Sequence, residues 1–229
     1  MPLIPIEAIV AALAVAFVAA MIYFGVRFMR ESREEKEKRA AARAEVGRRA
    51  AAKGRRIENG VGHVLWTQHG TTPNGEAWTL AYCVGYHERM MQDVGRPIVV
   101  ERDMITGQHL EWRCPAVKHA KLAFSFYKRT DDKKKPEEVS FDPDDELWRR
   151  WRLEARDEAI ARRAFSPAVC ALLTKLPLGI AWNTYIDERT SITLGSDGLL
   201  AVLGLDDVTP DLVDLWIDVN EGLAAGIKV

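Results

Sequence analysis

The hydrophobic pattern of the chain opens with one uncharged run, Ala8 to Val26, before apolar and polar positions begin to alternate. The run holds nineteen residues, of which only Gly25 lies outside the usual apolar set. As a helix rising 1.5 Å per residue it would measure about 28 Å, close to the roughly 30 Å hydrocarbon core of a bilayer. This pattern predicts a membrane-spanning helix through residues 8–26, with residues 1–28 as the anchor.

Two alternatives to a spanning helix fit the run less well. A cleaved signal peptide has a positive segment before its apolar run, whereas MPLIPIE has no Lys or Arg and ends in Glu7, although Val18-Ala19-Ala20 resembles a weak cleavage site. A buried helix of a soluble core seldom runs so far without a polar residue. Hydrophobic matching therefore favours an anchor in the lipid bilayer.

Charge predicts the orientation of this anchor. No basic residue precedes the run, and seven follow it between Arg27 and Arg43, which places the C-terminal side in the cytoplasm by the positive-inside rule. The expected topology is a single-pass protein of the cell membrane with its N-terminus outside. The three scattered cysteines, Cys83, Cys114 and Cys170, suit a reducing compartment and agree with it.

After the run, residues 29–56 are predicted to form a basic helical stalk. They are rich in Ala, and pairs such as Glu34 and Lys38 stand at the i to i+4 spacing that supports a helix. Residues 27–56 hold twelve Lys or Arg against five acids, a net charge of +7, while residues 57–229 carry −7. The stalk is expected either to attract anionic lipid headgroups or only to set topology and solubility. Nucleic acid is not an expected partner, because no aromatic residues interleave with these charges.

From Val61 onward the hydrophobic period changes to two, which predicts a mostly antiparallel sheet in a β-rich subdomain at residues 57–135. A hairpin turn is expected at Gly70–Gly75, and Gly47 and Gly54 are the natural weak points or stops of the stalk helix. The expected strands are Val61–Thr67, Trp78–Val84, Pro97–Glu101 and Lys121–Lys128.

A polar loop around residues 131–138 is the expected boundary to a second subdomain, residues 136–229, in which helices pack on strands. Helix caps are predicted at Asp142, Ser166 and Thr209, each followed by Pro, while Leu147–Ala155 fits either a helix or a strand. Further strands are expected at Ile180–Ile186, Ser191–Leu194 and Leu199–Leu203. The fold class is therefore α+β: a transmembrane helix, a charged helical stalk, and a sheet domain with packed helices.

The layout of the chain is similar to that of bacterial single-pass membrane-anchored proteins of unknown function. The resemblance is carried by the anchor, the charged stalk, the acidic FDPDDELW segment, the WRRWRL segment, the Phe165-Ser-Pro167 helix and the closing amphipathic helix. It covers the anchor and residues 141–229, and it implies no activity and no functional residue.

The strongest candidate for chemistry is a metal site formed by Cys83, His87, His109 and Cys114. Two Cys and two His on adjacent strands could hold a tetrahedral zinc ion, although the spacings C-x3-H and H-x4-C are not the usual ones. The alternative is that these are unconnected, partly buried side chains. No cofactor is predicted.

Nucleophilic and phosphate-binding patterns are absent from the sequence. Ser196 stands in a G-S-D-G turn, Ser166 caps a helix, and no G-x-S-x-G or G-K-S/T sequence occurs. The chain is thus expected to be a protein-binding or scaffold module presented in the cytoplasm to an unidentified protein partner, with no catalytic residue. The alternative is a membrane-tethered enzyme, with or without a metal, that uses His87, His109 or His119.

Overall fold

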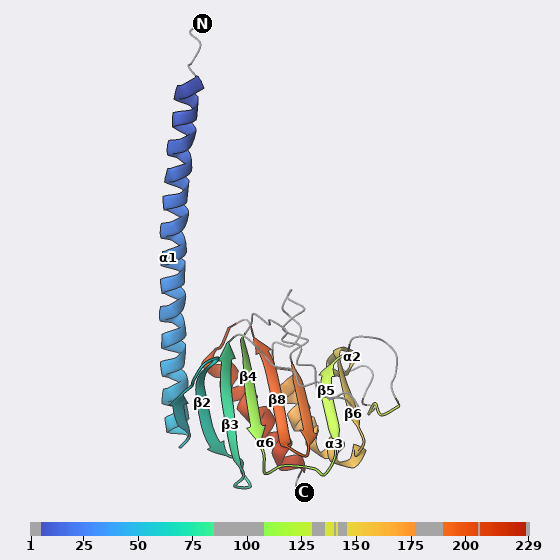
Figure 1. The fold of residues 1–229 in the computed structure, drawn as a ribbon. Helices are drawn as coiled ribbons and strands as arrows, with labels where there is room; N and C mark the ends of the chain where they lie inside the picture. The colour runs from blue at the N-terminus through green and yellow to red at the C-terminus, as the bar shows by residue number, and fades with distance from the viewer. Residues whose placement is uncertain are drawn as a thin grey trace, which may run out of the picture. The chain divides into compact units, whose positions relative to one another are not determined.

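The structure is a computed structural model that describes residues 6–84, 108–129, 136–139, 141, 146–176, 190–205 and 207–227. The chain divides into two compact units, Met1–Glu45 and Val46–Val229. The first helix, α1 (Ile6–Ala52), begins in the first unit and contributes its last two turns to the second (Figure 1).

A glycine ends α1, as the sequence predicts. Gly54 has a φ of 68°, and the N–H of Arg55 donates to the carbonyl of Ala50 at 2.8 Å, which is the hydrogen bond of a Schellman C-cap. Within the parts of the chain that the structure describes, no helix combines the length and the apolar character that crossing a bilayer demands. The predicted span at residues 8–26 is therefore not supported by the structure.

The described residues of the second unit form one antiparallel eight-stranded sheet with the order β1-β2-β3-β4-β8-β7-β5-β6. This confirms the predicted α+β class with a mostly antiparallel sheet. The strands are β1 (Arg56–Asn59), β2 (Val64–Thr71), β3 (Ala77–Val84), β4 (Gln108–Cys114), β5 (Phe124–Lys128), β6 (Trp151–Ala155), β7 (Ser191–Gly195) and β8 (Gly198–Leu205).

The described helices bury their apolar residues on one side of this sheet. They are the last turns of α1 together with α2 (Glu146–Arg150), α3 (Glu158–Ala164), α4 (Pro167–Leu173) and α6 (Pro210–Ile227). Figure 1 shows α3 and α6 behind the strands, and α6 contacts β4 and β8 near the middle of the sheet.

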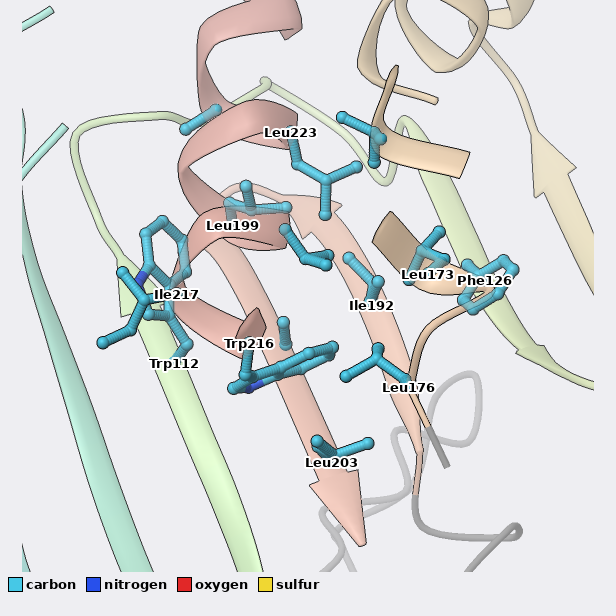
Figure 2. Packing of buried hydrophobic residues seen from close by; sticks show 14 of the residues in the cluster. Trp112, Phe126, Leu173, Leu176, Ile192, Leu199, Leu203, Trp216, Ile217 and Leu223 are labelled. Carbon is cyan, nitrogen blue, oxygen red and sulfur yellow. The ribbon is translucent and has the colours of Figure 1, made fainter. Parts of the chain in front are cut away.

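A single row of core side chains crosses all eight strands on the helical side. In Figure 2, Ile217 of α6 lies beside Trp112, one member of this row, and Leu223 of α6 lies near Leu199 of β8. Because side chains alternate along each strand, the apolar residues of the row all face the helices. The row consists of Ile57, Gln68, Leu80, Trp112, Ala201, Ile192, Phe126 and Leu153.

Local capping predictions are confirmed where the structure describes them. Ser166 accepts the N–H of Val169 at 3.4 Å at the start of α4, and Thr209 accepts the N–H of Leu212 at 3.3 Å at the start of α6. The segment Leu147–Ala155 adopts both expected structures in turn, since α2 passes directly into β6 at Trp151. The predictions at Pro97–Glu101, Asp142 and Ile180–Ile186 lie outside the described residues.

Three elements were not predicted from the sequence. They are β1, which begins at Arg56 inside the predicted stalk, together with β4 and α3. Strands from both sides of the predicted boundary at residue 135 share the one sheet, since β4 pairs with β8, and β5 lies between β7 and β6.

Candidate functional site

The face of the sheet turned away from the helices is lined mostly by polar and small side chains, and we call it the polar face. Two rows on it cross all eight strands. The outer row is Arg56, His69, Thr79, Arg113, Leu200, Thr193, Ser125 and Glu154, and the middle row is Glu58, Thr67, Ala81, Glu111, Val202, Ser191, Tyr127 and Arg152.

On β3 and β4, burial on the polar face is greatest beyond the middle row. Arg113 is exposed, and Thr79 and Thr193 are half-buried. By contrast Cys83 and His109, which are direct register partners beyond the middle row, retain only 3% and 2% of their exposure. A partner molecule can therefore reach the outer row, of which Arg56 and Arg113 are exposed, more easily than the residues beyond the middle row.

Charged side chains on the polar face form ion pairs or hydrogen bonds with neighbours on the same face. Arg113 pairs with Glu111, Tyr127 donates to Glu154, and His69 Nε2 lies 3.6 Å from Glu58 Oε2. These pairs leave the face with both signs of charge and hydroxyl groups between them, rather than with a strong field of one sign.

A buried ion-pair cluster marks the β6 edge of this face. Arg152 is fully buried, and its Nε lies 3.2 Å from Glu138 Oε2, while Arg129 pairs with the other oxygen of the same carboxylate. Glu138 belongs to a short segment that adds backbone hydrogen bonds to β6, including Val139 N–H to Leu153 O at 2.9 Å. The cluster thus fastens this segment to the edge strand.

The three described residues of the predicted zinc site, Cys83, His109 and Cys114, do not converge. Cys83 and His109 are neighbours on the polar face, but Cys114 lies in the core on the other side, where its thiol donates to the carbonyl of Ala77 at 3.4 Å. His87 lies outside the described residues. No group of three or more potential ligands occurs within the described segments.

Burial also keeps the Cys83 thiol unreactive. It raises the pKa of Cys83 to about 11, Glu111 adds to the rise, and Arg113 opposes it. Because the thiolate is the reactive form, a thiol with this pKa is a poor nucleophile at neutral pH.

The remaining candidates are spread over the molecule. His69 is on β2, His63 precedes it in a turn, and His119 Nδ1 lies 3.0 Å from the carbonyl of Lys121 in the loop after β4. Ser196 lies in the β7–β8 turn, and Cys170 donates to the carbonyl of Phe165 at 3.4 Å. These positions share no common site with His109.

A cluster of opposite charges that was not predicted from the sequence lies where the end of α1 meets α6. Arg49 of α1 and Lys53, which directly follows α1, stand four residues apart, and Asp211 and Asp214 stand three apart on α6, so each pair lies on one side of its helix. Arg49 Nη1 lies 2.6 Å from Asp211 and Lys53 Nζ lies 2.7 Å from Asp214. The matching charge stripes were a signal in the sequence that could have revealed the contact.

Comparisons of the chain with protein-family models, curated proteins and solved structures gave no match.

Proposed function

We propose that this chain is a single-pass membrane protein that presents its α+β domain in the cytoplasm as a protein-binding module. The anchor rests on the sequence, namely the nineteen uncharged residues at Ala8–Val26 and the arginines that follow them. The observation that supports binding is the accessible outer row of the polar face, opposite a helical side that is filled by its own core.

The spread of the histidines favours binding over catalysis. An active site brings together a nucleophile or base and the groups that orient it. Here His69, His109 and His119 lie on different elements and do not meet. The buried Cys83–His109 pair contains a thiol whose raised pKa keeps it neutral.

Anionic lipid headgroups are proposed as a secondary partner of the stalk. Within the first unit, Arg30 Nε lies 2.8 Å from Glu34 and Arg33 Nε lies 3.0 Å from Glu37. Such exposed pairs dilute the positive field, because each glutamate offsets one arginine. We therefore expect the headgroup contribution to be small and to come from the part of the stalk that directly follows the uncharged run.

Membrane attachment is tested by extracting membranes that carry the full chain with alkaline carbonate. The full chain should stay in the pellet, and a variant lacking residues 8–26 should be released. A C-terminal reporter that is active only in the cytoplasm tests the orientation. Release of the intact full chain, or its recovery trimmed near Ala20, contradicts the anchor.

Binding is tested by placing a photoreactive residue at Thr79 or Thr193 of the outer row in the membrane-attached chain. The matched control carries it at Asp218, which is exposed on α6. A discrete protein adduct from Thr79 and Thr193, absent at Asp218, supports the polar face as the binding surface. Adducts of equal yield at all three positions, or at none, refute this assignment without affecting the carbonate result.

A further inference from the structure

The last two turns of α1 are built into the core of the domain. Val46 and Ala50 are four residues apart, so they share one helix face, and they keep only 3% and 2% of their exposure. Gly47 lies between them, and a Cβ added there would lie 3.8 Å from Ile57 of β1, which is an ordinary van der Waals contact. The end of α1 is therefore part of the second unit, where one of its faces is buried while residues 51–54 stay exposed.

An outer layer of ion pairs surrounds this buried face. Asp214 accepts from Lys53 at 2.7 Å and from Arg49 at 3.4 Å, and Arg49 also reaches Asp211 at 2.6 Å. The side chain of Asp211 is 86% exposed and that of Asp214 is 21% exposed. Salt should screen this layer strongly, because the Debye length falls from about 8 Å at 0.15 M to about 3 Å at 1 M.

An inner layer lies closer to the sheet and is shielded from water. The guanidinium of Arg55 lies 3.2 Å from Glu221, 3.7 Å from Asp214 and 5.3 Å from the centre of the Trp78 ring. The indole N–H of Trp78 donates to the same Glu221 at 3.1 Å. β2 makes room for this indole at Gly70, where a Cβ would approach the Trp78 ring to 2.3 Å.

We propose that Arg49, Lys53 and Arg55, together with Asp211, Asp214 and Glu221 of α6, form an ionic latch that decides whether the last two turns of α1 are docked on the domain. The shared carboxylate of Asp214 is its centre, since Arg49, Lys53 and Arg55 all reach it. α1 is the covalent route from residues 6–45 to the domain. The latch therefore controls whether a conformational change in the stalk is transmitted to α6 and to the sheet on which α6 packs.

The latch is tested by amide hydrogen exchange on the full chain in detergent micelles, followed in peptides that cover residues 46–56. In Asp214→Asn at 0.15 M salt, and in the unaltered chain at 1 M salt, exchange in these peptides should rise about tenfold, because several pairs are lost together. Asp197→Asn removes an exposed acid of the β7–β8 turn that makes none of these pairs, and it should change exchange less than twofold.

Peptides from β8 distinguish undocking from unfolding, since their exchange should stay unchanged. If Asp214→Asn also raises amide exchange in β8, the variant Lys53→Gln distinguishes undocking from unfolding. It weakens the outer layer of ion pairs and leaves the core unchanged. Unchanged exchange of residues 46–56 in that variant and at 1 M salt overturns the latch and leaves Val46 and Ala50 as the sole basis of docking. The result does not depend on membrane insertion, so it is separable from the proposed function.

Discussion

Gln68 interrupts an otherwise apolar row of core side chains. It is 1% exposed, and its Oε1 has no hydrogen-bond partner within the described residues. A buried polar atom without a partner costs about 1–3 kcal/mol, and an apolar residue of similar shape avoids this cost. We therefore expect Gln68→Leu to raise the free energy of unfolding by about 1 kcal/mol, measured by urea denaturation.

The neighbouring Thr67→Val on the polar face is the control for Gln68→Leu, and it should change stability by less than about 0.5 kcal/mol. A clear loss of stability in Gln68→Leu would show that the amide is bonded after all, through a group beyond the described residues.

Glu221 gives the domain a predictable dependence on pH. Burial raises the pKa of Glu221 above its ordinary value, more than the opposing effects of Arg55 and the Trp78 N–H lower it. The folded state therefore holds this proton more tightly than the unfolded state. The resulting stabilisation is complete below the ordinary glutamate pKa of 4.5 and is lost as the pH rises through the raised pKa.

Glu221→Gln tests this sign, since Gln keeps an oxygen that can accept from Trp78 and Arg55 but cannot titrate. The stability of the unaltered protein minus that of the variant should fall between pH 4 and pH 7, as measured by urea denaturation at each pH. A difference that rises over this range would mean that the ion pair with Arg55 outweighs burial.

At the scale of elements, two glycines near the end of α1 should respond in opposite ways to alanine. Gly54 sits at a φ of 68°, where a Cβ is strained, whereas Gly47 is helical and has room for one. Gly54→Ala should destabilise the domain by about 1 kcal/mol, and Gly47→Ala should stabilise it by roughly 0.5–1 kcal/mol. Thermal unfolding of the two variants provides the comparison, and shifts of the same sign would contradict the assigned end of α1.

Elements whose ends are set by local chemistry were predictable from the sequence. Ser166 and Thr209 cap their helices through side-chain oxygens, and Gly54 ends α1 through its backbone conformation, so each signal lies within a few residues of its effect. The last helix was predictable because its apolar residues recur at helical spacing.

Elements that depend on tertiary contacts were not predictable in this way. In β4 the adjacent His109 and Leu110 are both buried, which breaks the alternation expected of a half-buried strand. The four residues of β1 are mostly polar and follow a charged helix, so nothing local marks them as an edge strand. Helix α3 buries only Ala161 and Ala164, which gives too weak an apolar stripe.

The metal site was a candidate because β4 could not be recognised from the sequence. Its residue types were a valid reason to consider zinc, but His109 and Cys114 are five positions apart on one strand and therefore point to opposite faces. Recognising β4 from the sequence would have excluded the site at once. The polar face was not predictable, because its rows assemble from eight strands whose order the sequence does not show.

At the scale of the whole molecule, strand order ties together the two subdomains that the sequence suggested. Strands β1 to β5 precede residue 135, and β6 to β8 follow it, yet β5 is inserted between β6 and β7. Phe126 of β5 is fully buried and stacks on Trp151 of β6 with ring centres 5.1 Å apart. Removing β5 would leave β6 without its neighbour and open the core beneath it.

This arrangement predicts that a break in the chain near residue 135 does not separate two folding units. With a protease site inserted between Lys133 and Lys134, the cleaved protein should remain associated and unfold in one transition, because β4–β8 and β5–β7 pairing hold the pieces together. The isolated piece 136–229 should show no cooperative unfolding by circular dichroism. A cooperative transition in that piece alone would mean that β6, β7, β8 and their helices form a domain without β5, and the eight strands would then be two units in contact rather than one sheet.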